Sequence, residues 1–78
     1  MKISNFAFVP ATVPVKSGAK VTVTNNDTTA HTATADDGSF DTGTLDRGAS
    51  KTITVGKSGT VAYHCTIHPF MKAKIVVG

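Results

Sequence analysis

The chain has 78 residues, a formal net charge of +3 and one cysteine, so an intrachain disulfide is excluded. No stretch approaches the roughly 18 apolar residues of a membrane-spanning helix. The basic residues are scattered, and one Tyr and four Phe offer few stacking platforms for a nucleic acid. We expect a single domain over residues 1–78, with a core so small that a metal or a partner would help to stabilise it.

Apolar and polar residues alternate with a period of two through most of the chain, which predicts strands. Thr and Val, which favour strands, are common, whereas Glu is absent and Leu occurs once. Pro14 cannot donate a ladder hydrogen bond, so its strand is expected at a sheet edge or a bulge. In chain order, the predicted strands lie at residues 5–8, 13–15, 20–24, 31–35, 52–55, 60–65 and 72–77.

Turn-forming residues separate these strands at 16–18, 25–27 and 56–59. The one long irregular piece, roughly residues 36–48, is predicted to be a surface connection with room for one short strand. Short strands at regular spacing favour an all-β sandwich or barrel.

Three residues with metal-binding chemistry follow one another at even spacing: Cys65, His68 and Met71. Pro69 argues against a helix because it lacks an N–H and biases the preceding residue toward extended geometry. The segment is therefore predicted to be a tight loop between two strands. A thiolate, an imidazole and a thioether suit copper, and a His2Cys set with a weak axial Met is typical of electron-transfer copper sites.

This loop lacks the second histidine of such a set, which leaves His31 and His64 as candidates. Side chains alternate between the two faces of a strand, so His64 is expected to point away from the face of Cys65. His31 follows a polar turn and begins a predicted strand, which makes it the better candidate. Because His31 is distant from Cys65 in the sequence, a shared metal would tie distant parts of the chain together.

Other interpretations are available for these residues. Taken singly, a Cys or a Met is commonly core filler, but their joint spacing is hard to explain by packing. Copper sequestration or delivery would use the same ligands and stays open beside electron transfer. Met71 disfavours a zinc site, and the segment has no carboxylate to orient a histidine for a cysteine enzyme. A metal-free adhesion-type sandwich leaves the spacing unexplained.

Residues 63–71, Tyr-His-Cys-Thr-Ile-His-Pro-Phe-Met, resemble the copper loop of the cupredoxins, which include plastocyanin, azurin and pseudoazurin, and are most similar to the amicyanin type. Residues 8–10, 15–18, 21–23 and 25–27 resemble the opening strands of that family. The resemblance implies a Greek-key β-sandwich, here in a trimmed version. It also implies a type 1 (blue) copper centre that shuttles single electrons by Cu(II)/Cu(I) cycling and is not an enzyme. The ligand positions match His31, Cys65, His68 and Met71.

The resemblance further implies that His68 lies near the surface within an apolar patch of Ile67, Pro69 and Phe70. Redox-partner proteins would form transient complexes there. We expect a monomer without a nucleic-acid partner or a membrane span. Its expected location is the periplasm or the extracellular space, with an export signal not present in this chain.

Two positions near the copper loop depart from the family's pattern. Thr32 stands where many relatives have Asn, and its backbone N–H is expected to reach the Cys65 sulfur. Ile67 stands where amicyanin-type loops often carry Pro, which has no N–H. The Ile67 N–H is therefore predicted to donate to the same sulfur and to raise the reduction potential.

Overall fold

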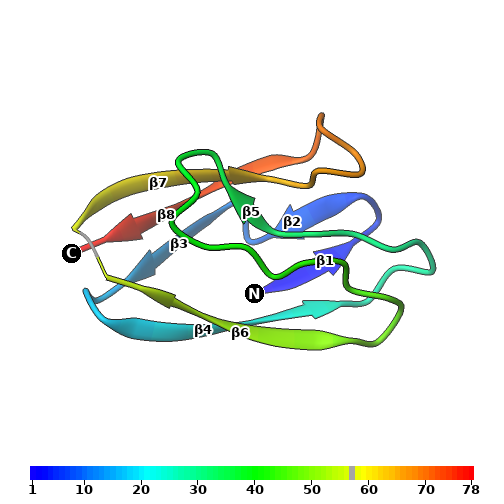
Figure 1. Cartoon of the computed structure of the whole chain (residues 1–78), viewed down its shortest axis with the longest axis horizontal. Coiled ribbons are helices and arrows are strands. Elements are labelled where there is room, and N and C mark those ends of the chain that lie inside the picture. Colours follow the sequence, from blue (N-terminus) through cyan, green and yellow to red (C-terminus); the bar gives the residue numbers. More distant parts are fainter. Residues whose placement is uncertain (57) are drawn as a thin grey trace.

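The computed structural model describes residues 1–56 and 58–78, and within these ranges the regular structure is entirely strand. Two four-stranded sheets face each other in a sandwich (Figure 1), with strand orders β2-β1-β4-β6 and β3-β8-β7-β5. The predicted all-β sandwich is therefore confirmed. The strands are β1 (Lys2–Ser4), β2 (Ala7–Val9), β3 (Thr12–Val15), β4 (Ala19–Asn25), β5 (Thr34–Ala35), β6 (Ser50–Val55), β7 (Gly59–His64) and β8 (Lys72–Val77).

The order of the strands follows a crossing pattern. From β4 onward the chain passes to the other sheet for β5, returns for β6 and crosses again for β7. These crossings place residues that are distant in sequence on facing sheets. No helix in the described residues could span a membrane.

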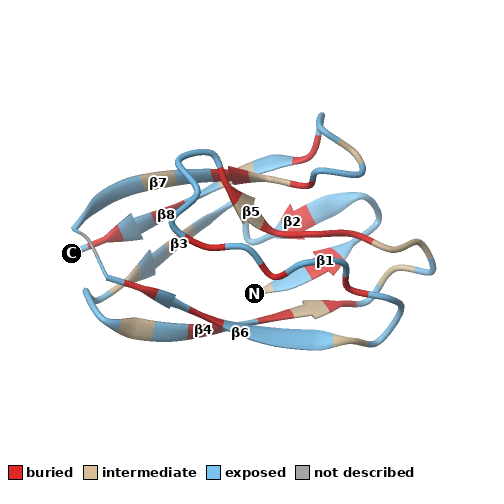
Figure 2. Ribbon diagram, in the orientation of Figure 1, coloured by how far each residue is buried: buried red, intermediate tan, exposed pale blue. Residues whose placement is uncertain are grey.

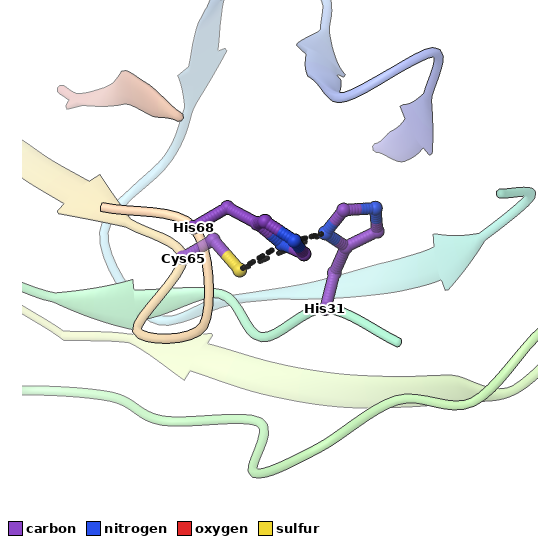
Figure 3. Close-up of side chains that lie close together, drawn as sticks. All are labelled: His31, Cys65 and His68. Atoms are coloured by element: carbon purple, nitrogen blue, oxygen red, sulfur yellow. Dashed lines mark hydrogen bonds between the residues drawn. The ribbon is translucent and has the colours of Figure 1, made fainter. Parts of the chain in front are cut away.

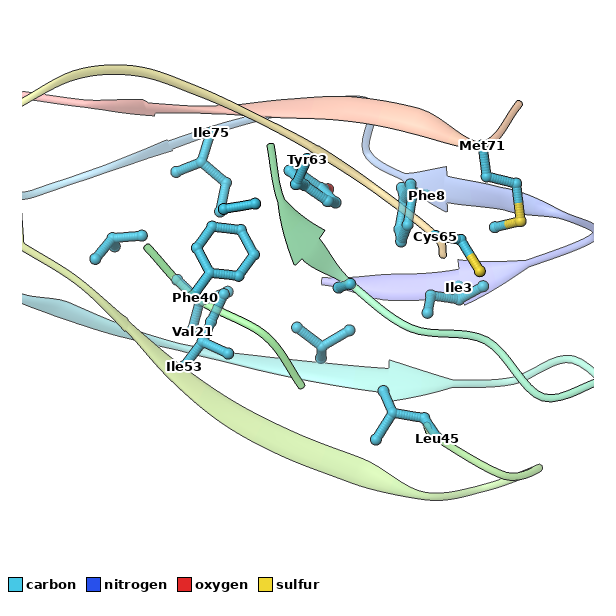
Figure 4. Close-up of a cluster of buried hydrophobic side chains, with 14 of the residues drawn as sticks. Ile3, Phe8, Val21, Phe40, Leu45, Ile53, Tyr63, Cys65, Met71 and Ile75 are labelled. Carbon is cyan, nitrogen blue, oxygen red and sulfur yellow. The ribbon is translucent and has the colours of Figure 1, made fainter. Parts of the chain in front are cut away.

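The core lies between the sheets because the apolar residues of each strand share one parity. Figure 2 shows buried positions alternating with exposed ones along the strands, as in β6, where Ile53 and Val55 are buried. Aromatic and aliphatic side chains meet in this layer (Figure 4): Phe8 and Tyr63 come from the two sheets, and Phe40 comes from the connection between β5 and β6. The sequence pattern therefore predicts the buried faces of β4, β6 and β8 correctly.

Pro14 lies in β3, which forms an edge of its sheet and pairs on one side only, in parallel with β8. The expected edge position is confirmed. The predicted strand at 31–35 is shorter in the structure, where β5 covers Thr34–Ala35 and His31 forms an isolated bridge to Leu45. The bridge joins His31 to a residue of the long connection at 36–48, and its two backbone hydrogen bonds fix the backbone of His31.

The first predicted strand, residues 5–8, is wrong in its bounds. Asn5 and Phe6 instead form a two-residue turn between β1 and β2, with φ of 52° and 57° respectively. Left-handed backbone at both positions defines a type I′ hairpin turn. Asn tolerates this conformation, whereas it costs Phe6 roughly 1–2 kcal/mol. In the sequence Phe6 fits the alternating pattern of a strand, but in the structure it lies in the turn. Figure 1 shows this turn, the connection after β4 and the β7–β8 loop at the same end of the sandwich.

Candidate metal centre

The end of the sandwich that carries these three connections brings His31, Cys65 and His68 together. The Cys65 Sγ lies 3.7 Å from His31 Nδ1 and 4.0 Å from His68 Nδ1. The two Nδ1 atoms are 3.2 Å apart, and the three side chains converge on one point in Figure 3. Of the described residues, these three form the group of possible ligands whose donor atoms all lie within 4.8 Å of one another.

This spacing fits one bound cation. Metal–nitrogen and metal–sulfur bonds of about 2.0–2.3 Å place trigonal donor atoms roughly 3.5–3.7 Å apart. The three observed separations, 3.2, 3.7 and 4.0 Å, bracket that range. Two imidazoles and a thiolate also form a donor set that copper prefers. The geometry and the chemistry of the donors therefore both suit copper.

The β7–β8 loop presents Cys65 and His68 because its base is closed by backbone hydrogen bonds. Cys65 donates its N–H to the Met71 carbonyl at 3.1 Å, and Met71 donates to the His68 carbonyl at 2.9 Å. Cys65 continues the inward parity of Tyr63, and both are fully buried. Met71 is buried as well and lies at the same end of the core as Cys65 in Figure 4. The loop thus turns Cys65 and Met71 inward and leaves His68 half-buried.

His31 is fully buried and is held by Asp27. Its Nε2 lies 2.8 Å from Asp27 Oδ2. A carboxylate can only accept, so Nε2 carries a proton, and Nδ1 is the ring nitrogen that faces Cys65 and His68. The interaction selects the tautomer that a metal requires. Sequence reasoning missed Asp27, although a carboxylate four residues before a candidate ligand was a usable signal.

Asp27 also binds the β1–β2 turn. Its Oδ1 accepts the Asn5 N–H at 2.7 Å and its Oδ2 accepts the Phe6 N–H at 2.8 Å. The Phe6 hydrogen bond is the main cause that holds the pKa of Asp27 below its ordinary value; partial burial opposes it, and Asn5 and His31 add to the lowering. Asp27 is therefore an anion that joins the turn to His31.

The Cys65 sulfur accepts a hydrogen bond from the Thr32 backbone N–H at 3.3 Å, as the sequence predicted. The predicted bond from Ile67 is wrong: the hydrogen bonds of the described residues include none from Ile67 to this sulfur. The loop is attached one residue earlier, where the Thr66 N–H donates to Thr32 Oγ1 at 2.9 Å. Ile67 is 45% exposed beyond that attachment.

The Thr32 hydroxyl is the centre of a network of side-chain hydrogen bonds at this position. Besides accepting from the Thr66 N–H, it lies 3.2 Å from Thr66 Oγ1 and 3.1 Å from Thr34 Oγ1. Thr34 in turn donates to Asp41 at 3.1 Å. This chain of hydroxyl groups joins the segment of the first histidine to the Cys65 loop.

We expect Thr32→Val, which preserves the shape of the side chain, to lower the free energy of unfolding of the metal-free protein. The substitution leaves the Thr66 N–H without its partner, at a cost of about 1–3 kcal/mol. Urea denaturation measures the change. Thr22→Val is the control, because the Thr22 hydroxyl pairs with Thr52 on an exposed face and should matter by less than about 0.5 kcal/mol. Equal losses in the two variants would show that the tether does not stabilise the loop.

His64 lies outside the cluster, as strand parity predicts. It pairs with β5 and β8 neighbours, and its Nδ1 forms an ion pair with Asp36. The Asp36 side chain is 57% exposed, so this second histidine–carboxylate pair is a surface feature.

An apolar surface surrounds the half-buried His68. Phe70 is 71% exposed, and its ring centroid lies 6.0 Å from that of His68. Ile67, Pro69 and Phe6 are also exposed. Large apolar side chains exposed together indicate a contact surface.

This chain is similar to known proteins in both sequence and fold. Residues 1–77 match a family model described as a cupredoxin-like domain. Amicyanin-alpha of Methylorubrum extorquens is 32% identical over 82 aligned positions, which cover 99% of this chain and 69% of the relative. Solved structures of amicyanin variants, among them a reduced Cu(I) form and an oxidised form, superpose with a TM-score of 0.90 at 28% identity, over 99% of this chain and 78% of theirs.

Proposed function

Because this chain belongs to the cupredoxin-like family, we propose that it is a type 1 (blue) copper protein that carries single electrons between redox partners. The observation that carries the proposal is the convergence of one thiol and two imidazoles at one end of the sandwich, with donor atoms within 4.8 Å. Bound copper would supply the one-electron exchange between Cu(II) and Cu(I).

In this proposal His31, Cys65 and His68 would be the strong ligands of the copper ion, and Met71 would be a weaker fourth ligand. The donor spacing and the orientation of the His31 Nδ1 toward Cys65 and His68 support the first three assignments. The burial of Met71 and its backbone link to Cys65 support the fourth. His31 and Cys65 are held by Asp27 and Thr32, so the ligands need little rearrangement when the charge of the ion changes.

We place the contact with redox partners at His68, Pro69 and Phe70. An electron carrier must dissociate after each transfer, and transient redox complexes bury less than about 1,200 Å² in total. The exposed apolar side chains around the half-buried His68 suit such a contact. Lys72 and Lys74 follow on exposed positions of β8 and would steer an acidic partner in a manner that salt weakens.

A periplasmic or extracellular location belongs to the same proposal. Cys65 is fully buried, which protects a single thiol from oxidation or pairing in an oxidising compartment.

The burial of both His31 and Cys65 also favours retention of the ion over its delivery to another protein.

The experiment is a visible absorption spectrum after one equivalent of Cu(II) is added to the metal-free protein. We expect a strong blue colour that bleaches reversibly with a reductant and is lost in Cys65→Ser. His64→Ala is the control, since His64 is adjacent in sequence but outside the cluster, and it should remain blue. A pale or colourless wild-type product would contradict the proposal. Rapid loss of the ion to a mild chelator, without reversible cycling, would favour copper delivery.

A further inference from the structure

The β1–β2 turn carries a residue that its backbone conformation disfavours. Asn5 and Phe6 both have positive φ, 52° and 57°. Asn tolerates this conformation, but the second position of a type I′ turn ordinarily takes glycine, and a bulky side chain there is an outlier. Such outliers persist where the surroundings hold them, and they cluster at functional sites.

Asp27 holds the turn in this conformation and connects it by hydrogen bonds to the candidate ligand His31. Its Oδ2 accepts two hydrogen bonds, from the Phe6 N–H and from Nε2 of His31, each at 2.8 Å. One carboxylate oxygen therefore fixes the backbone of Phe6 relative to the imidazole of His31.

The Phe6 ring packs against both imidazoles of the cluster. Its centroid lies 5.4 Å from that of His31 and 5.3 Å from that of His68, with interplanar angles of 90° and 86°. These values are typical of edge-to-face aromatic pairs. The three rings form a triangle, because the two imidazole centroids are 4.9 Å apart.

The two histidines differ in what sets the orientation of their rings. His31 has Asp27 on the nitrogen that faces away from the cluster. The hydrogen bonds of His68 within the described residues involve Nδ1 alone, and its other contacts are with the rings of Phe6, Phe70 and His31. The orientation of His68 therefore depends on ring packing, and Phe6 is the ring that touches both histidines.

We propose that Phe6 is a positioning residue of the metal centre, which transmits the fixed orientation of His31 to His68 so that both Nδ1 atoms face Cys65 before a metal binds. Core packing does not account for a Phe at this turn position, because the side chain is 43% exposed. The proposal rests on the copper function proposed above, but it concerns an orientation of the two histidine rings that already exists in the metal-free chain.

Phe6→Gly is the informative variant because glycine suits the turn better than Phe. We expect the metal-free variant to be at least as stable as the wild type in urea, yet to lose copper about tenfold faster to an excess of chelator. Phe6→Tyr retains the ring and should restore the wild-type rate. Phe70→Ala is the matched comparison: Phe70 lies against His68 without a ring contact to His31, so this variant should lose copper more slowly than Phe6→Gly. Phe6→Leu keeps apolar volume without a flat ring and should behave like Phe6→Gly.

A second measurement needs no copper. We expect NMR relaxation of the His68 ring in the metal-free protein to report greater mobility in Phe6→Gly than in the wild type or Phe70→Ala. The proposal would be overturned if Phe6→Gly and Phe70→Ala had the same rate of copper loss and the same His68 ring mobility. Failure of Phe6→Tyr to restore the wild-type rate of copper loss would overturn it as well. A colourless wild-type protein with an ordered, Phe6-dependent His68 would reject the copper function while supporting the positioning role.

Discussion

Copper binding is expected to raise the melting temperature of this protein by about 15–30 °C. An ion that binds the folded chain alone stabilises it by RT ln(1 + [L]/Kd), about 4 kcal/mol when the free ion is at a thousand times its Kd. One kcal/mol shifts the melting temperature of a domain this small by about 4–8 °C. The proposed ligands span residues 31–71, so a bound ion would close a long loop in the folded chain. Differential scanning calorimetry of the metal-free and copper-loaded forms measures the shift.

The control is Cys65→Ser, which should fold but show little of the copper-induced shift. Cys65 is fully buried, and Ser preserves nearly its size, so the metal-free forms should melt at similar temperatures. Equal melting temperatures for the metal-free and loaded wild type would show that the ligands do not converge on the ion as the donor distances indicate. A shift that persists in Cys65→Ser would place the copper elsewhere on the chain.

The features that sequence alone predicted correctly depend on local chemistry. The alternation of apolar residues identifies the buried faces of β4, β6 and β8 because a strand has only two faces. Pro14 marks an edge strand because it lacks a donor. The same parity separates His64 from Cys65 across one strand. Each of these inferences needs only a few neighbouring residues.

The features that sequence missed depend on backbone geometry and on contacts across the fold. Phe6 continues an alternating pattern, and only the left-handed φ values reveal that it lies in a turn. In the sequence Asp27 is one polar residue of a turn among several, and only the fold brings it to the β1–β2 turn, 21 residues away at Phe6. The predicted hydrogen bond from the Ile67 N–H to the Cys65 sulfur is wrong, and the neighbouring Thr66 N–H donates to Thr32 Oγ1. A loop lacks the fixed periodicity of a strand, which would indicate the direction of each N–H. Long-range partners of a single polar side chain leave little trace in one sequence.

Asp27→Asn is expected to weaken both the fold and the metal site, although it preserves the size of the side chain. Asp27 accepts hydrogen bonds on both carboxylate oxygens, whereas an amide has one acceptor and would set its own NH2 against an N–H donor. Hydrogen bonds to a charged group contribute about 1.5–3 kcal/mol each, so we expect a loss on the order of 3 kcal/mol. Copper affinity should fall by about 10–100-fold, as for other partners of histidine ligands. Urea denaturation and competition with a chelator measure the two effects.

The effect of Asp27→Asn on stability should depend on pH, in a direction that the Asp27 pKa sets. The pKa of Asp27 in the folded protein lies below its ordinary value of 3.8, so the folded chain favours the carboxylate. The stabilisation by Asp27 is therefore complete above pH 3.8 and is lost as the pH falls through the lower folded value. The stability difference between wild type and Asp27→Asn should be constant near neutral pH and shrink in acid.

Asp36→Asn provides the matched comparison for Asp27→Asn, since Asp36 pairs with His64 on the surface. It removes the same charge from the same kind of pair, but at a histidine outside the cluster. We expect Asp36→Asn to leave copper affinity unchanged and to cost less than about 1 kcal/mol of stability, as exposed ion pairs do. If both variants lost copper affinity equally, net charge rather than the orientation of His31 would explain the effect. A loss of copper affinity confined to Asp27→Asn would show that the centre depends on the carboxylate that holds Nε2 of the His31 imidazole.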